Sequence, residues 1–271
     1  MQLSETKRIH FQTITSTNDY LKEIINDYDK LIVTAEFQTA GRGRNSKVWD
    51  GKFGLNVYFS YGINHKKIPP FKNFSYYQLI GALSTYKTLV NLTNLGNFRI
   101  KYPNDIHFIS DEDKQNIIQS IENMSTDNIN YSTKSNSKKI SGILAEHNFM
   151  GGELVSTIIG IGINVNQKIF KDELSDIVTS LYNLGFNFQI DDVIDELTKN
   201  IELLLNIDED KLFEQWSSLL NLYDKDIVVI NKEGIYRLKT ILKDCRLLLI
   251  ENNSNNELMV DNGDSVRYIL S

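Results

Sequence analysis

The amino-acid sequence predicts an α+β fold in which a mixed β-sheet is packed with helices and a small β-barrel follows at the C-terminus. Strand-like apolar runs are interspersed with segments whose apolar residues recur at helical spacing, and residues 225–271 read as short strands broken by glycine and asparagine. A hydrophobic content of 41% over 271 residues supplies a sizeable core. We therefore expect a large domain over residues 1–222 and a small one over residues 225–271.

The N-terminal part predicts a strand, a helix and two further strands. The first strand covers residues 9–14, and Ser16 supplies a hydroxyl that can cap the helix whose apolar series runs from Tyr20 to Tyr28. Residues 31–38 and 55–61 read as strands. The glycine-rich polar loop between them, residues 39–54, is long for a plain hairpin, so we expect it to have a function.

The middle of the chain predicts more sheet and further helices. Strands are expected over residues 98–101, 106–108, 140–147 and 154–165, and helices over residues 76–92, 191–205 and 209–222. Between two of these strands, residues 109–138 are dominated by Asn, Ser, Asp, Lys and Gln. Such a composition buries too little apolar area to offset the entropy of ordering, which predicts a mobile insertion.

Composition excludes several classes of protein. A net charge of −6 and a pI near 5.3 argue against a broad phosphate-binding surface, so nucleic acid is not an expected partner. The single cysteine, Cys245, excludes an intramolecular disulfide, and the first residues lack the apolar core of a secretory signal. No stretch approaches the ~20 apolar residues that span a bilayer. We expect a cytoplasmic protein without a membrane partner.

The loop from Gln38 to Arg44 alternates two glycines, Gly41 and Gly43, with two arginines, Arg42 and Arg44. Guanidinium groups match the oxygens of phosphate and carboxylate, and the glycines allow close backbone approach and closure over a reactive intermediate. Taken alone, the same composition fits a solvated surface loop equally well.

Two further segments carry polar groups at strand ends. In Lys101-Tyr-Pro-Asn-Asp105, a proline after a strand brings together an amide and a carboxylate that could hold Mg²⁺ and triphosphate oxygens, although an ordinary turn has the same composition. In Lys138-Lys-Ile-Ser-Gly142, Lys139 stands at a strand entrance and could neutralise a carboxylate and a phosphate. We interpret Lys138 as an exposed end of the insertion.

A glycine-rich strand end, Gly160-Ile-Gly162-Ile-Asn164, could let a nucleotide lie against the backbone. It lacks the third glycine of a dinucleotide fingerprint, and the chain has no phosphate-binding P-loop motif, so any use of ATP needs another kind of phosphate site. Trp49 could stack on an adenine or simply cover core. His10, His65, His107 and His147 lack metal-type spacing, and no nucleophile-elbow motif is present.

Taken in order, these motifs over residues 9–166 resemble those of biotin protein ligases. The resemblance is carried by Ser16-Thr-Asn18, Gln38, Gly41-Arg-Gly-Arg44, Trp49, Lys101–Asp105, Lys139–Gly142 and Gly160–Asn164. It implies a class II synthetase-like (biotin–lipoate ligase) fold with an SH3-like C-terminal barrel. It also implies ATP-dependent biotinylation, through biotinoyl-5'-AMP, of a lysine on the biotin carboxyl carrier domain of acetyl-CoA carboxylase or a related carboxylase. ATP and Mg²⁺ would be co-substrates, and a homodimer is compatible with the family.

The resemblance also implies roles for individual residues. Lys139 and Arg42 would act in catalysis by neutralising charge, and Asp105 would meet Mg²⁺ bound to ATP. The implied biotin contacts are Ser16, Thr17, Asn18, Gln38, Arg42, Gly43, Arg44, Lys139 and Gly142. The implied nucleotide contacts are Gly41, Arg44, Trp49, Asn104, Asp105, Gly160, Gly162 and Asn164.

The sequence departs from the family pattern at four places. Asn45-Ser46 replaces a further basic residue and a glycine, which bears on loop closure; residues 109–138 are unusually long; and Thr240 to Leu247 lacks a glycine-bearing turn. The chain begins at the first catalytic strand, so we expect a single-function enzyme without the winged-helix DNA-binding domain and without a repressor role.

Three other functions are the alternatives to weigh from the sequence. A lipoate or octanoate ligase of the same fold would carry an Arg-Arg pair, a glycine triplet and a histidine, and none of these occurs between Gly41 and Gly54. A non-catalytic biotin-binding regulator would have no need of Lys139 and the arginine loop. A nucleic-acid-binding loop protein conflicts with the acidic charge balance.

Overall fold

The computed structural model of the protein describes residues 6–44, 48–112, 115, 137–220, 222–261 and 263–268. Asn45-Ser46 and most of the predicted insertion at residues 109–138 lie outside the described residues, so the expectations for them stay predictions. Within the described part, no helix is long and apolar enough to cross a membrane.

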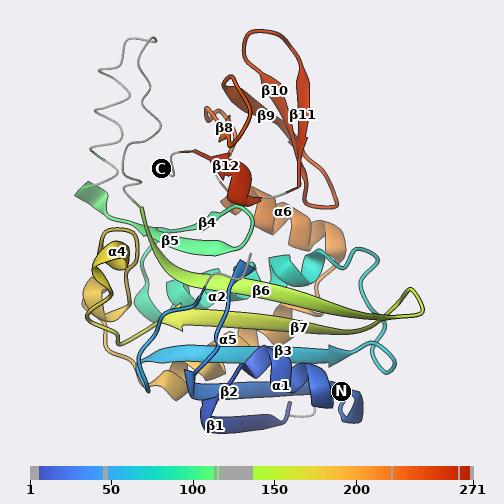
Figure 1. Ribbon diagram of the computed structural model, residues 1–271, viewed down its shortest axis with the longest axis vertical. Helices are drawn as coiled ribbons and strands as arrows, with labels where there is room; N and C mark the ends of the chain where they lie inside the picture. Colours follow the sequence, from blue (N-terminus) through green and yellow to red (C-terminus); the bar gives the residue numbers. More distant parts are fainter. Residues whose placement is uncertain are drawn as a thin grey trace.

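A seven-stranded mixed sheet forms the centre of the molecule, in the order β1-β2-β3-β7-β6-β5-β4 (Figure 1). Its strands are β1 (Arg8–Ile14), β2 (Lys30–Gln38), β3 (Asn56–Asn64), β4 (Phe98–Lys101), β5 (Asp105–Ile109), β6 (Ser137–Met150) and β7 (Glu153–Asn164). Strands β1 and β2 are parallel, and the other neighbours are antiparallel. The predicted mixed sheet is therefore confirmed.

Helices cover both faces of this sheet (Figure 1). Helices α2 (Tyr76–Thr93) and α5 (Ile190–Leu204) lie on one face, and α1 (Thr17–Ile24) covers part of the other. The remaining helical elements are η1 (Ile25–Asp27), α4 (Asp172–Ser175), η3 (Tyr182–Leu184), α6 (Glu209–Leu219) and η4 (Gly263–Ser265). Helix α2 packs closely because Gly81 faces Ile143 and Ile159, whose methyl groups would clash with a Cβ at that position.

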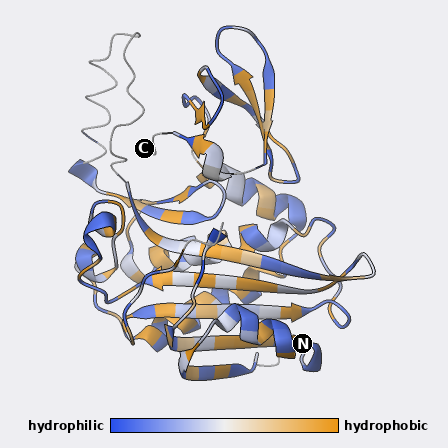
Figure 2. Ribbon diagram, viewed as in Figure 1, coloured by the Kyte–Doolittle hydropathy of each residue, from blue (hydrophilic) through white to orange (hydrophobic). Residues whose placement is uncertain are grey.

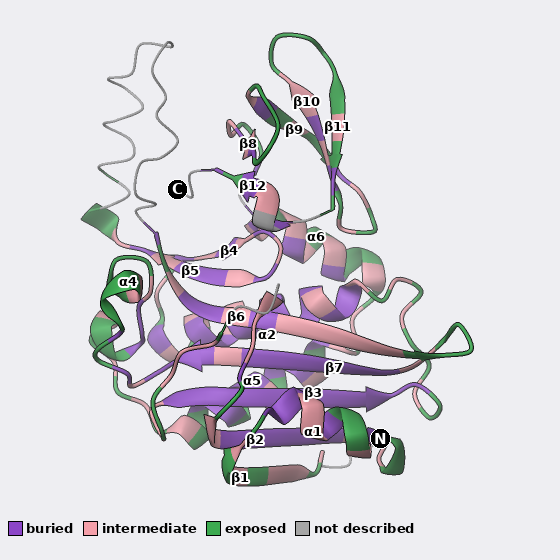
Figure 3. Ribbon diagram, in the orientation of Figure 1, coloured by how far each residue is buried: buried purple, intermediate pink, exposed green. Residues whose placement is uncertain are grey.

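The central strands are the most deeply buried part of the fold. Every residue of β3 is buried, whereas the edge strand β1 contains only intermediate and exposed residues (Figure 3). Apolar side chains of β3, β6 and β7 join those of α2 and α5 in the main core, as the hydropathy colouring shows (Figure 2). A second, smaller cluster lies under α1 and comprises Leu21, Ile25, Leu31, Val33 and Ile158. Packing on both faces makes the sheet a rigid platform for the loops at its ends.

The C-terminal part forms two small antiparallel sheets, as expected for an SH3-like module. One contains β9 (Tyr236–Ile241), β10 (Leu247–Glu251) and β11 (Glu257–Val260), and the other pairs β8 (Val228–Val229) with β12 (Val266–Arg267). In the turn that lacks glycine, Cys245 adopts the left-handed conformation (φ 70°) that glycine commonly supplies. The Tyr102 N–H donates to Tyr268 Oη at 2.8 Å and ties this module to the large domain.

Candidate active site

A cavity of about 500 Å³ opens on the face of the sheet that α1 partly covers. The sequence-predicted residues that line it are Ser16, Thr17, Asn18, Gln38, Arg42, Gly43, Arg44, Trp49, Asn104, Asp105, Lys139, Gly142, Gly160, Gly162 and Asn164. Gly41 does not belong to this lining, but its carbonyl accepts the Trp49 N–H at 3.1 Å. The fold thus brings motifs that are far apart in the sequence to one cavity.

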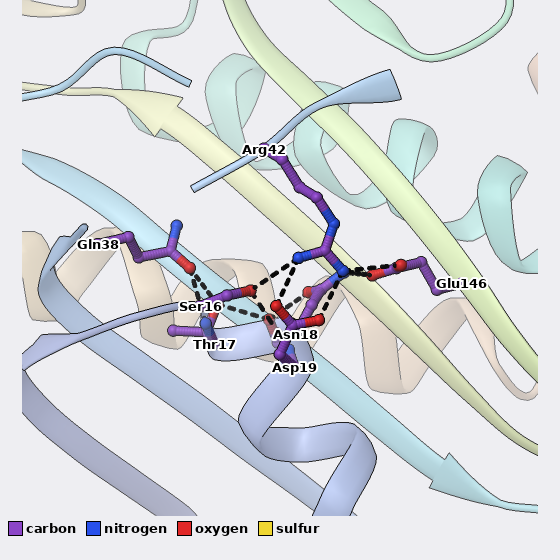
Figure 4. Close-up of polar contacts among 8 residues, drawn as sticks. Ser16, Thr17, Asn18, Asp19, Gln38, Arg42 and Glu146 are labelled. Carbon is purple, nitrogen blue, oxygen red and sulfur yellow. Dashed lines mark hydrogen bonds and ion pairs between the residues drawn. The ribbon is translucent and has the colours of Figure 1, made fainter. Parts of the chain in front are cut away.

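One end of the cavity is a buried network of neutral polar groups at the start of α1 (Figure 4). Ser16 caps the helix by accepting the Asp19 N–H at 3.3 Å. The N–H and hydroxyl of Thr17 donate to Gln38 Oε1 at 2.7 and 3.0 Å. Ser60, Thr17 and Asn18 are 0%, 3% and 7% exposed. We call this part, formed by residues 16–18, Gln38 and Ser60, the polar end.

Three residues of this region were not among those predicted from the sequence: Asp19, Ser60 and Glu146. The Arg42 guanidinium bonds both oxygens of Asp19 at 2.6 Å and also contacts Glu146 at 2.9 and 3.2 Å (Figure 4). The hydrogen bond from Arg42 holds the pKa of Asp19 below its ordinary value. A local signal exists for Glu146, because the two-residue period of β6 puts it on the same face as Gly142.

Trp49 lies on a floor of two glycines in the middle of the cavity. A Cβ at Gly162 would come within 2.6 Å of the indole, and one at Gly142 within 3.0 Å. The Trp49 Nε1 and the Asn164 Oδ1 are buried and have no hydrogen-bond partner among the described residues. An unpaired buried donor and acceptor beside a flat glycine floor fit an aromatic ligand with polar edges, such as a purine.

The other end of the cavity contains cations. Lys139 Nζ forms an ion pair with Asp105 Oδ1 at 2.7 Å and lies 5.6 Å from the Trp49 ring centroid. Backbone bonds hold Lys139 to Ile177 and Thr179 at 2.8 and 2.9 Å, so this lysine is fixed on a strand rather than in a loop. We call this part, with Lys139, Asp105, Asn104 and Arg44, the cationic end.

Arginines from two other parts of the chain, Arg44 and Arg267, also belong to this region of the cavity. Arg44 Nη1 donates to Asn104 Oδ1 at 3.4 Å, and Asn104 Nδ2 donates to the Ile143 carbonyl at 2.6 Å. The C-terminal module contributes Arg267 to the cavity wall, which the sequence did not predict. Nearby, burial lowers the pKa of His107 well below its ordinary value, and Lys101 and Lys139 add to this effect, so His107 is neutral.

The acidic residues of this region do not form a metal centre by themselves. Within the part of the chain that the structure describes, no group of three or more His, Cys, Asp or Glu side chains is arranged to hold a metal ion. Asp105 contributes one carboxylate, and Lys139 already pairs with it. A divalent cation at this position would need most of its ligands from a bound phosphate group.

The chain matches the model of the biotin/lipoate A/B protein ligase family over residues 10–164. It belongs to this family. A Bacillus subtilis relative named bifunctional ligase/repressor BirA is 32% identical over 177 residues, which are 64% of this chain and 45% of the relative, so the match spans less than half of that protein. The Salmonella typhimurium protein of the same name is 23% identical over 272 residues, 93% of this chain and 75% of that protein.

Solved structures agree on the fold of this biotin/lipoate A/B ligase family member. The Aquifex aeolicus biotin protein ligase in complex with biotin and ATP has a TM-score of 0.71 and 24% identity, covering 98% of this chain and 100% of that one. The Leishmania major biotin protein ligase in complex with biotinyl-5-AMP has a TM-score of 0.59 and 15% identity, covering 95% and 100%. At these identities the likeness establishes the fold, including the C-terminal module.

Proposed function

We propose that this protein is a biotin–protein ligase. It would use ATP to convert biotin into biotinoyl-5'-AMP and then transfer the biotinoyl group to a lysine on the biotin carboxyl carrier domain of acetyl-CoA carboxylase or a related carboxylase. The observation that carries the proposal is one cavity in which a glycine floor under Trp49 joins a buried polar end to a cationic end. Such a cavity suits a ligand with an uncharged polar ring, a carboxylate and a nucleotide.

The polar end favours biotin over lipoate. The ureido ring of biotin offers both donors and an acceptor to hydroxyl and amide groups such as those of Ser16, Thr17 and Gln38. The dithiolane ring of lipoate offers no comparable hydrogen bonds, and burying it there would leave these polar groups poorly satisfied. Hydrogen-bonding sites discriminate strongly against ligands that lack the matching groups.

The cationic end suits the adenylation step. A carboxylate is ionised at neutral pH and needs no general base. Its oxygen would attack the α-phosphorus of ATP, forming an O–P bond while the bond to the β-phosphate oxygen breaks and pyrophosphate leaves. Lys139 and Arg44 would offset the negative charge that accumulates between the reacting oxygens, and the floor under Trp49 would orient the purine.

The second step would consume the mixed anhydride. The neutral amine of the acceptor lysine attacks the acyl carbonyl, the bond between the carbonyl carbon and the phosphate oxygen breaks, AMP leaves, and the nitrogen releases one proton to the solvent. Lys139 would stabilise the departing phosphate. Mg²⁺ belongs to this scheme as a companion of ATP, with Asn104 and Asp105 as oxygen-bearing side chains of the kind that Mg²⁺ prefers.

Intact-mass analysis tests the proposal directly. A biotin carboxyl carrier domain is incubated with the protein, Mg·ATP and biotin, beside a lipoyl domain incubated with lipoate. We expect a biotinyl mass gain on the carrier domain alone, and a far slower gain with the Lys139→Ala variant. Modification of the lipoyl domain alone would replace the proposal with a lipoate ligase, and modification of neither domain would favour a non-catalytic binding protein.

A further inference from the structure

Arg42 binds two carboxylates of the protein at the polar end instead of pointing a free guanidinium into the cavity (Figure 4). Its Nη1 contacts Asp19 at 2.6 Å and Ser16 at 3.5 Å, and its Nη2 contacts Asp19 at 2.6 Å and Glu146 at 2.9 Å. Both terminal nitrogens are therefore engaged. The hydrogen bonds that Arg42 donates to Asp19 and Glu146 raise the pKa of Arg42 above its ordinary value.

The same arginine belongs to the neck of the glycine-rich loop. The backbones of Arg42 and Val48 form an isolated antiparallel bridge, and the Trp49 N–H donates to the Gly41 carbonyl at 3.1 Å. We call these four residues, 41, 42, 48 and 49, the loop neck. Because the Arg42 side chain is bound to α1 and β6, it attaches the loop neck to the sheet.

Glu146 also orients a side chain of the polar end. Its Oε2 accepts from Asn18 Nδ2 at 2.7 Å, which turns Asn18 Oδ1 toward the Ser60 hydroxyl at 2.5 Å. Gly160 lies directly under this amide, because a Cβ there would be 2.3 Å from Asn18 Oδ1. The carboxylate thus fixes both a loop residue and a residue of α1.

We infer that Asp19 and Glu146 are positioning residues that act through Arg42: they hold the loop neck on the sheet and set the arrangement of the polar end. The effect on biotin rests on the proposed function, whereas the effect on the loop neck does not. Both terminal nitrogens of Arg42 are then occupied by two carboxylates of the protein, whereas the Lys139 ammonium, with three donors, pairs with Asp105, so the carboxylate of a ligand is left to the cationic end.

Hydrogen–deuterium exchange of the protein without ligand tests the structural half. Asp19→Asn combined with Glu146→Gln keeps the side-chain shapes and removes both charges. We expect amide exchange in the peptide containing Trp49 to accelerate at least ~5-fold, with no change for the matched control Glu153→Gln on the exposed end of β7. Unchanged exchange in the double variant would overturn the inference, whatever ligand the protein binds.

Steady-state kinetics of biotin-dependent ATP–pyrophosphate exchange tests the functional half. For Asp19→Asn and Glu146→Gln we expect the KM for biotin to rise about 10-fold, as for a lost charge-assisted hydrogen bond, while kcat and the KM for ATP stay within about 2-fold. Equal losses in all three constants, together with a lowered Tm, would indicate a general structural role and overturn the inference. Absence of exchange in the wild-type protein would instead overturn the proposed function and leave the loop-neck result to decide the inference.

Discussion

Glu146 and His147 are neighbours on β6 but lie on opposite faces of the sheet, in opposite electrostatic surroundings. Glu146 lies on the sheet face that carries the cavity, and the lining residues Arg42 and Asn18 bind its carboxylate. His147 faces α2 beside Phe74 and Tyr77, and burial lowers its pKa to about 4. At these two positions, the cavity side keeps a charge that is paired with another charge, and the α2 side keeps its polar groups neutral. We therefore expect substitutions on the face that carries the cavity (the cavity face) to change catalysis. Substitutions on the face that α2 covers (the helix face) should change stability.

The largest effect on catalysis is expected at the cationic end. Lys139→Ala removes the cation that pairs with Asp105 and should slow adenylate formation by about 10²- to 10³-fold, as for loss of one preorganised charge-stabilising group. Single-turnover formation of biotinoyl-AMP measures this rate. The adjacent exposed Lys138→Ala is the matched control and should behave like wild type. A rate within 3-fold of wild type for Lys139→Ala would contradict the role assigned to this lysine.

The next largest effect is expected at the polar end. In Gly160→Ala, the new methyl group meets Asn18 Oδ1, and overpacking of about 1 to 3 kcal/mol should raise the KM for biotin about 10- to 100-fold. The KM for ATP should change much less. Gly96→Ala is the control, because among the described residues no atom beyond its chain neighbours lies within 4 Å of its Cβ position. If the KM for ATP rose as much as that for biotin, the polar end would not be a separate binding region.

A second glycine substitution, two residues after Gly160 on β7, tests the nucleotide side of the cavity. In Gly162→Ala, the methyl group would meet the Trp49 indole, which a loop residue can relieve by moving. We expect the KM for ATP to rise about 10-fold, the KM for biotin to stay nearly constant and the tryptophan fluorescence to shift. An unchanged KM for ATP, despite a spectral change, would separate Trp49 from nucleotide binding.

The helix face should show no effect on catalysis but a clear dependence of stability on pH. His65 Nδ1 donates to the Ile68 carbonyl, which can only accept. In the neutral ring, His65 Nε2 accepts from the Thr157 hydroxyl, whose oxygen in turn accepts from His147 Nδ1. A second proton on His65 Nε2 would remove the hydrogen bond that this nitrogen accepts. The pKa values of both histidines are lowered, mainly by burial.

The sign of the pH effect follows from those lowered pKa values. Between pH ~6.5 and about 4 the unfolded chain binds a proton at His147 that the folded protein does not, so the free energy of unfolding falls as the pH falls. We expect a loss of about 2 kcal/mol between pH 7 and pH 5 in urea unfolding. His147→Gln should reduce this slope, and an equal slope in the variant would assign the pH dependence to other groups.

Local pattern was sufficient to predict most of the fold. The helix expected over residues 76–92 is α2 (Tyr76–Thr93), because its apolar residues recur at helical spacing on a buried face. Strands β3 and β6 extend further than expected, through Asn64 and from Ser137, because polar residues there are still paired in the ladder. Polar residues at the end of a strand give no hydrophobic signal in the sequence, although their backbones are hydrogen-bonded in the sheet.

The chemistry of the cavity was only partly predictable. Lys139 and Trp49 stand in motifs, and they line the cavity as expected. The pairing of Arg42 with Asp19 and Glu146 joins residues 23 and 104 positions apart, and no local periodicity reports such a contact. Arg267 reaches the cavity only through the packing of the C-terminal module. Contacts that only the tertiary structure creates can be identified only once the fold is known.

The pairing of Ile109 with Ser137 has a consequence for the position of Lys139. These two residues face each other across the ladder between β5 and β6, and His107 Nδ1 lies 3.0 Å from Ser137 Oγ, so both ends of the intervening connection are fixed two residues before Lys139. We therefore expect the position of Lys139 to depend on these two fixed ends of the strands and not on the length of the chain between them.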